Sequence, residues 1–162
     1  MISSIHPIPF QEVHQLATMA KEIWYEYYLS IITQEQIDYM LERFYNREKL
    51  EQEWNDGVHF LFLGDVEKPC GFLSISEQAA GNFFIHKFYV KKEKRGEGIG
   101  SKAFLELIQQ MPEAKEIRLQ VNRKNKAVGF YEKNGFQILR VDDFDIGNGF
   151  YMNDYIMGCP IE

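Results

Sequence analysis

The fold is decided by the stretch Val90-Lys91-Lys92-Glu93-Lys94-Arg95-Gly96-Glu97-Gly98-Ile99-Gly100-Ser101. An apolar strand ends at Val90, a glycine-rich basic loop turns, and an amphipathic helix begins. Glycines let the backbone approach a ligand closely and point successive N–H groups at it. The start of the helix adds partial positive charge and free N–H donors. The segment therefore predicts an anion site suited to phosphate.

Two other nucleotide-binding loops are the alternatives for this stretch. Gly96, Gly98 and Gly100 alternate, so they miss the Gly-x-Gly-x-x-Gly spacing of a Rossmann dinucleotide site. A Walker A loop needs a lysine before its Ser or Thr, whereas Gly100 is followed directly by Ser101. The spacing disfavours both readings and leaves open a tight turn that binds no ligand.

The rest of the chain predicts helices, then an antiparallel meander, then a β-α-β-α-β-β order. The turns between the second, third and fourth strands are too short for parallel crossovers. We therefore expect an α/β (α+β) fold. The expected strands are 1–8, 58–63, 70–76, 83–90, 117–121, 136–141 and 150–157, and the expected helices are 13–28, 34–44, 47–54, 99–111 and 126–134.

Length and charge bound the class of protein. The chain has 162 residues and a formal net charge of −6. This length suits one domain with a sizeable core, so we expect a single domain over 1–162. The negative charge disfavours a nucleic-acid partner. No stretch approaches the roughly 20 apolar residues of a membrane span, and no signal peptide is recognisable. We expect a cytoplasmic protein without a membrane partner.

The cysteines and histidines predict no metal site. The two cysteines, Cys70 and Cys159, are far apart, and the four histidines show no ligand-like spacing with them.

A second motif follows the loop at Val121-Asn122-Arg123-Lys124-Asn125-Lys126-Ala127-Val128-Gly129-Phe130-Tyr131-Glu132-Lys133-Asn134-Gly135-Phe136. It resembles the Asn-x-x-Ala-x-x-Phe-Tyr-x-x-x-Gly-Phe motif of GNAT acetyltransferases, in which a larger residue than Gly129 is common. The loop itself resembles the Gln/Arg-x-x-Gly-x-Gly/Ala signature of the same family. The resemblance covers Phe83 to Phe136 and rests on two motifs in the family's order.

The resemblance implies a GNAT fold, with a mixed, mostly antiparallel sheet flanked by helices, and transfer of acetyl from acetyl-CoA to a primary amine. In the family, the strand before the loop binds the acetyl end and pantetheine arm through its backbone, and the loop amides bind the pyrophosphate. The implied contacts to acetyl-CoA are Phe88, Val90, Arg95, Gly96, Gly98, Gly100, Ser101, Asn122, Asn125 and Lys133.

Tyr131 is the expected general acid. An amine that attacks a thioester expels a thiolate, and a nearby phenol can protonate it, since the reference pKa values are about 10 for Tyr and about 8.5 for a thiol. Without the motif, Tyr131 reads as a packing aromatic. His86 is the candidate base, since alternation places it on the same strand face as Phe88 and Val90. A structural histidine and a water chain remain alternatives for the base.

The helical N-terminal part and the last hairpin bear on the identity of the acceptor amine. In the family, the first two helices and the last hairpin shape the acceptor site, which implies Trp24, Glu26 and Tyr28 as substrate contacts. Acids interleaved with aromatics suit a cationic acceptor. The closing segment 149–157 also resembles that of bacterial polyamine acetyltransferases. The alternatives are a protein N-terminus or lysine as acceptor, or a CoA-binding sensor without catalysis. Monomer and homodimer both remain open.

Overall fold

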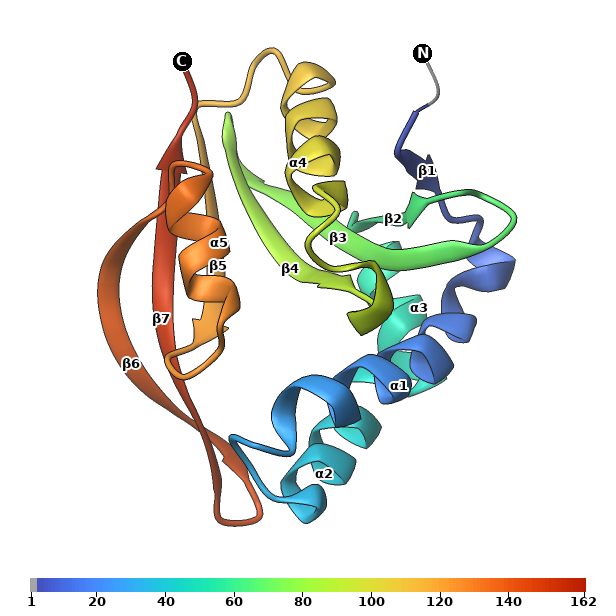
Figure 1. Cartoon of the computed structure of the whole chain (residues 1–162), viewed down its shortest axis with the longest axis vertical. Coiled ribbons are helices and arrows are strands. Elements are labelled where there is room, and N and C mark those ends of the chain that lie inside the picture. The colour runs from blue at the N-terminus through green and yellow to red at the C-terminus, as the bar shows by residue number, and fades with distance from the viewer. Residues whose placement is uncertain (1–2) are drawn as a thin grey trace.

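The computed structural model describes residues 3–162, and a seven-stranded sheet in the order β1-β2-β3-β4-β5-β7-β6 forms its centre (Figure 1). Only β4 and β5 pair in parallel; the other neighbours are antiparallel. This arrangement confirms the mixed, mostly antiparallel sheet. The strands are β1 (Ile5–Pro7), β2 (His59–Gly64), β3 (Pro69–Ala79), β4 (Asn82–Val90), β5 (Glu116–Asn122), β6 (Gln137–Gly147) and β7 (Phe150–Pro160).

Five α-helices cover the sheet, as the sequence predicted. They are α1 (Leu16–Tyr28), α2 (Gln34–Tyr45), α3 (Arg47–Asn55), α4 (Ile99–Gln109) and α5 (Ala127–Lys133), with 3-10 turns at Phe10–Gln15 and Lys92–Lys94. β1 lies at the sheet edge, where its proline is tolerated. Residues 1 and 2 of the expected first strand lie outside the described residues. Within 3–162, no helix combines the length and apolarity that crossing a membrane requires.

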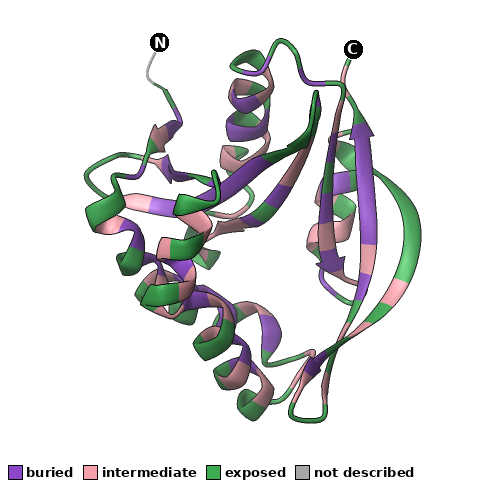
Figure 2. Cartoon of the chain, turned by 180° about the vertical axis from the view of Figure 1, so that it is seen from behind, coloured by how far each residue is buried: buried purple, intermediate pink, exposed green. Residues whose placement is uncertain are grey.

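The core has two parts, one on each face of the sheet (Figure 2). Strand β2 shows why: Phe60 and Phe62 pack toward α1, α2 and α3, whereas Leu61 and Leu63 pack toward α4 and α5. A strand buried on both faces has a continuous apolar sequence rather than an alternating one. The two helical layers therefore enclose the middle of the sheet, where the predicted site lies.

A bulge in β4 changes which way its side chains point. Ser74 of β3 pairs with Lys87, but the next residue pairs with Ile85, so His86 has no partner on β3. A bulge inserts one residue and shifts the alternation of faces. Phe88 packs on the α4 and α5 side, as Ile85 does, although the two residues are three positions apart. The prediction that His86 shares a face with Phe88 and Val90 was therefore wrong.

The bulge also marks where β4 and β5 part. Their parallel pairing runs only from Asn82↔Glu116 to Ile85↔Leu119. Beyond it, β4 continues to Val90 and β5 to Asn122 without pairing to one another. Backbone groups of both strands are thereby left free to bind something else, since a strand that loses its neighbour presents N–H and C=O groups.

The start of α2 and the end of β6 both involve contacts with β7. Thr33 Oγ1 accepts the Gln36 N–H at 3.1 Å and so caps α2. The Gln36 side chain donates to the Tyr151 carbonyl at 2.8 Å, which ties α2 to the last hairpin. Strand β6 runs on to Gly147, well beyond the predicted end at Val141, because its ladder with β7 continues to the turn.

Candidate active site

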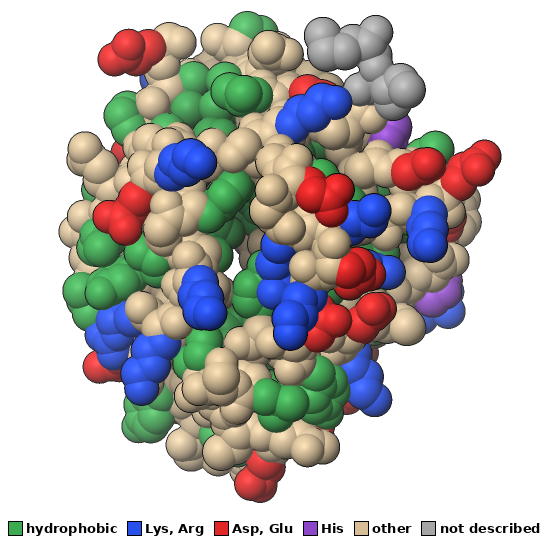
Figure 3. All heavy atoms as spheres, viewed as in Figure 1, with side chains coloured by type: hydrophobic (Ala, Val, Ile, Leu, Met, Phe, Trp, Pro, Cys, Tyr) green, Lys and Arg blue, Asp and Glu red, His purple; other side chains and the backbone are tan. Residues whose placement is uncertain are grey.

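The loop between β4 and α4 has the backbone expected of an anion site. Gly96 and Gly98 adopt positive φ values of 83° and 77°, which favour glycine, and Gly98 directly precedes α4. A Cβ atom built on either would meet no atom within 4 Å, so the space above the loop is open. Figure 3 shows Lys and Arg side chains, with acidic ones among them, around the hollow in the middle of this face. Free amides, open space and basic side chains fit a pyrophosphate.

Gly100 serves a different purpose from the other two glycines. A Cβ on Gly100 would lie 3.0 Å from the Phe130 ring, so glycine lets α4 pack closely on α5. Ser101, one residue on, accepts a hydrogen bond from Asn134 Nδ2 at 3.3 Å, which also joins these helices. Both predicted contacts therefore lie at the α4 start and hold the two motifs together.

Arg95 and Glu26 brace the loop against α1. Arg95 Nε donates to the Val90 carbonyl at 3.1 Å, and its guanidinium carbon lies 3.3 Å from the centre of the Tyr27 ring. Glu26 accepts the Lys92 N–H at 3.2 Å and lies 3.7 Å from Arg95 Nη2. The Arg95 side chain thus points toward α1. Glu26, predicted to touch the acceptor, contacts the loop instead and does not line the acceptor pocket described next.

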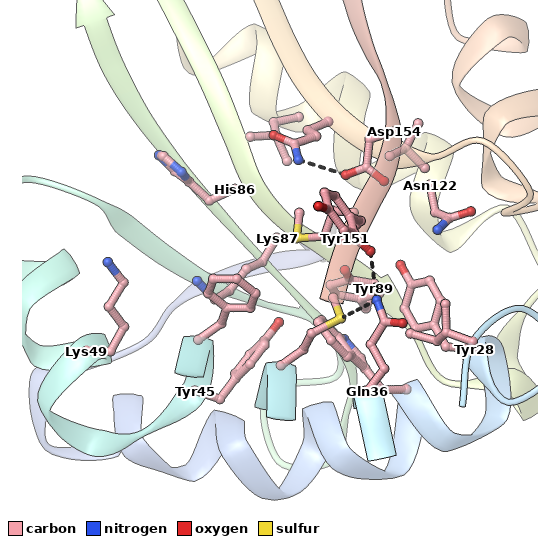
Figure 4. Close-up of a pocket in the computed structure, with 18 of the residues that line it drawn as sticks. Tyr28, Gln36, Tyr45, Lys49, His86, Lys87, Tyr89, Asn122, Tyr151 and Asp154 are labelled. Atoms are coloured by element: carbon pink, nitrogen blue, oxygen red, sulfur yellow. Dashed lines mark hydrogen bonds between the residues drawn. The ribbon is translucent and has the colours of Figure 1, made fainter. Parts of the chain in front are cut away.

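A cavity of about 300 Å³ opens between α1, α2 and the β4, β5 and β7 strands (Figure 4). Trp24 and Tyr28, which the sequence analysis proposed as acceptor contacts, line it. Aromatic and apolar side chains form most of its wall, which is typical of a small-molecule pocket. Its charged residues are Lys49, Glu53, Lys87 and Asp154. We call this cavity the acceptor pocket.

A second cavity, of about 30 Å³, adjoins the first. Tyr131, Phe88 and Asn125 line it, and Tyr28 and His86 border both cavities. Its volume is on the order of the space that one water molecule needs. The two cavities therefore bring the predicted acid, the candidate base and the acetyl-binding strand together.

Tyr131 is a buried side chain of α5 with 7% of its surface exposed. Its ring packs against Phe88, Phe130 and Phe136. Burial, followed by the nearby Tyr28 hydroxyl, raises the pKa of Tyr131 well above 10. The phenol is therefore protonated at neutral pH, as a proton donor must be.

His86 lies at the β4 bulge, where it contributes to the walls of both cavities. Its Nε2 forms a 2.7 Å hydrogen bond with Ser76 Oγ. Desolvation, and then the positive charge of Lys87, lowers the pKa of His86 below 6.5. The ring is therefore neutral at pH 7.

Asn125 is buried and makes two contacts. Its Oδ1 accepts the N–H of Ala127, the first residue of α5, at 2.8 Å, and its Nδ2 donates to the Tyr28 hydroxyl at 3.3 Å. Asn122 lines the acceptor pocket, and its Oδ1 accepts the Lys124 N–H at 2.9 Å. Asn125 thereby ties the second motif to α1.

Lys133 and Val90 complete the predicted set. Lys133 is exposed in the last turn of α5, on the rim of the second motif. Val90 ends β4, immediately before the basic loop. Neither position conflicts with a contact to an extended ligand that runs from the loop toward Tyr131.

Sequence reasoning missed the buried charges of the acceptor pocket. Lys87 Nζ lies 2.9 and 3.0 Å from the two Glu53 carboxylate oxygens. The position of Lys87 follows from the bulge, which local alternation cannot reveal. Asp154 is 4% exposed and accepts a hydrogen bond from Gln120 Nε2 at 2.7 Å. The one signal for Asp154 was an acid within a largely apolar last strand.

No group of three or more His, Cys, Asp or Glu side chains suited to a metal ion occurs in residues 3–162.

Comparison with known proteins agrees with this geometry. The family model of the acetyltransferase (GNAT) domain matches residues 28–155. A spermidine N(1)-acetyltransferase of Thermoplasma acidophilum is 29% identical over 153 residues, which are 90% of this chain and 94% of that protein.

Solved structures show the same fold. The PaiA N-acetyltransferase from Thermoplasma acidophilum, in complex with coenzyme A, is 26% identical, has a TM-score of 0.80, and is matched over 99% of this chain and 100% of that one. A GCN5-related N-acetyltransferase from Rhodopseudomonas palustris, 17% identical, has a TM-score of 0.78 over 99% and 98% of the two chains. The protein described here belongs to the GNAT acetyltransferase family and is an acetyl-CoA-dependent N-acetyltransferase.

Proposed function

We propose that this enzyme acetylates a primary amine of a small polyamine, by direct attack of the amine on acetyl-CoA with Tyr131 as general acid. The observation that carries the proposal is the pair of adjoining cavities, one lined by aromatic residues and a buried carboxylate, the other by Tyr131. The similarity to a spermidine N(1)-acetyltransferase supports the choice of acceptor.

The donor would lie along the loop and the free end of β4. In this arrangement the amides of Gly96 and Gly98 hold the pyrophosphate, and the backbone of Phe88 to Val90 holds the acetyl end. A backbone N–H near Val90 would stabilise the oxyanion of the tetrahedral intermediate. The open space above the loop and the separation of β4 from β5 support this placement.

The proton path follows from the two cavities. The amine nitrogen bonds to the thioester carbonyl carbon, the carbon–sulfur bond breaks, and Tyr131 donates its phenolic proton to the leaving thiolate. The amine proton passes to His86, directly or through one water in the small cavity. Desolvation that raises the Tyr131 pKa also raises that of the thiol, so the transfer stays feasible in the same environment.

The acceptor class is tested by thiol release from acetyl-CoA with matched panels of polyamines, amino acids and peptides with free N-termini. We expect the highest kcat/KM for a polyamine. A preference for peptides, with polyamines inert, would overturn the polyamine assignment and favour acetylation of a protein N-terminus or lysine. CoA binding without turnover on any amine would favour a sensor.

A further inference from the structure

The acceptor pocket contains two carboxylates, one partly buried (Glu53) and one buried (Asp154), and they differ in their partners. Glu53 is neutralised by Lys87, whose Nζ lies 2.9 Å from it. Asp154 takes part in none of the ion pairs found among residues 3–162; its close partner is the neutral amide of Gln120. One acid of the pocket therefore lacks a counter-ion.

Asp154 is buried, and a buried carboxylate without a counter-ion is unusual. Its side chain is 4% exposed, and Figure 4 shows it beside Asn122, at the opposite end of the pocket from Lys49. Arg123, the nearby cation, is held by Asp143 at 2.6 Å. Burial raises the pKa of Asp154, although the Gln120 hydrogen bond and the charge of Arg123 oppose this effect. A buried carboxylate that lacks a cation is destabilising unless something else supplies one.

Asp154 is also set apart from the reacting centre. Asp154 lines the acceptor pocket but not the small cavity that Tyr131 lines, whereas Tyr28 lines both. An amine placed to react beside Tyr131 would leave Asp154 to meet another part of the same molecule. The Asp154 carboxylate already accepts one hydrogen bond from an amide. A second ammonium group of the acceptor would donate to its remaining oxygen lone pairs and supply the missing positive charge.

We propose that Asp154 is a specificity-determining residue that binds the second, non-reacting ammonium of the acceptor and so selects diamines over monoamines. This inference rests on the proposed function, since it assumes that a small polyamine enters the acceptor pocket. Lys49 at the other end of the acceptor pocket favours one orientation of the diamine, because its charge repels an ammonium group and so favours binding of that group at the Asp154 end.

The test compares an alkyl diamine with the monoamine of the same chain length in wild type and Asp154→Asn. Asparagine keeps the size and can still accept from Gln120. We expect wild type to favour the diamine and Asp154→Asn to lose about 30-fold or more in kcat/KM for it, mainly through KM, as when one partner of a buried charge pair is removed. The monoamine should change little.

Asp142→Asn is the matched control, since Asp142 lies opposite Asp154 in the β6–β7 ladder but is already paired with Arg140 at 2.8 Å. It should leave the diamine preference intact. Calorimetric CoA binding and the unfolding temperature check that Asp154→Asn is folded. Diamine turnover with an unchanged preference in Asp154→Asn would overturn the role of Asp154 alone. No turnover of any diamine by wild type would overturn the proposed function, and this inference with it.

Discussion

At the scale of single residues, Tyr131 and His86 line the same small cavity, and their pKa values are shifted in opposite directions. Burial keeps the Tyr131 phenol protonated by raising its pKa, and desolvation keeps His86 neutral by lowering its pKa. An acid and a base whose environments separate their pKa values suit proton transfer at neutral pH. Asn125 ties the second motif to α1, since it contacts both α5 and Tyr28.

Replacing Tyr131 by Phe tests the acid. The ring stays packed against Phe88 and Phe136, so the fold should persist, while kcat should fall by roughly 10²–10⁴-fold with little change in KM for acetyl-CoA. Steady-state kinetics measure this directly. Tyr155→Phe is the control, because Tyr155 packs on the same core cluster. Equal, small effects of the two substitutions would indicate that Tyr131 only packs.

Replacing His86 by Gln tests the base. Because the pKa of His86 is below 6.5, the ring is unprotonated at pH 7 and gains its proton only as the pH falls below that pKa. We expect kcat/KM of the wild type to decline on that acid side, and His86→Gln to lower activity and abolish this limb of the profile. An unchanged pH–rate profile would remove His86 as the base and leave a water chain.

At the scale of elements, the predicted parts are those that local sequence encodes. The loop before α4 was found from the spacing of its glycines, because a glycine sets the backbone within a few residues. The side of the sheet on which His86 lies could not be predicted from local sequence, because the bulge arises from pairing between β3 and β4. The burial of Asp154 likewise depends on β5 pairing with β7, where Asn122 lies opposite it.

Gly98→Ala tests the loop as an element. Its φ of 77° is strained for alanine by about 1–2 kcal/mol. The same strain applies to Gly57, with φ of 94°, after α3, and neither Cβ would meet a neighbour. Both variants should lose similar stability on denaturation, but only Gly98→Ala should weaken CoA binding, on the order of tenfold or about 1.4 kcal/mol by calorimetry. Equal CoA affinity in both variants would exclude the loop as the pyrophosphate site.

At the scale of the whole molecule, the sheet separates two tasks. The loop and the α4–α5 face fit the acyl donor. Helices α1, α2 and α3 and strand β7 line the acceptor pocket, with β4 and β5 parting between the two regions. Acidic side chains of α1 and β6 lie outside this pocket: Glu22 pairs with Lys91, and Asp143 pairs with Arg123. The single-domain organisation, the cytoplasmic location and the choice between monomer and homodimer stay predictions.

Acetyl transfer to a polyamine is tested most directly by incubating the enzyme with acetyl-CoA and spermidine. Free thiol is measured by absorbance and the acetylated amine by mass spectrometry, in the same sample. We expect equal amounts of both, with the acetyl group on a primary nitrogen. Tight binding of CoA with neither thiol release nor an acetylated product would contradict this expectation.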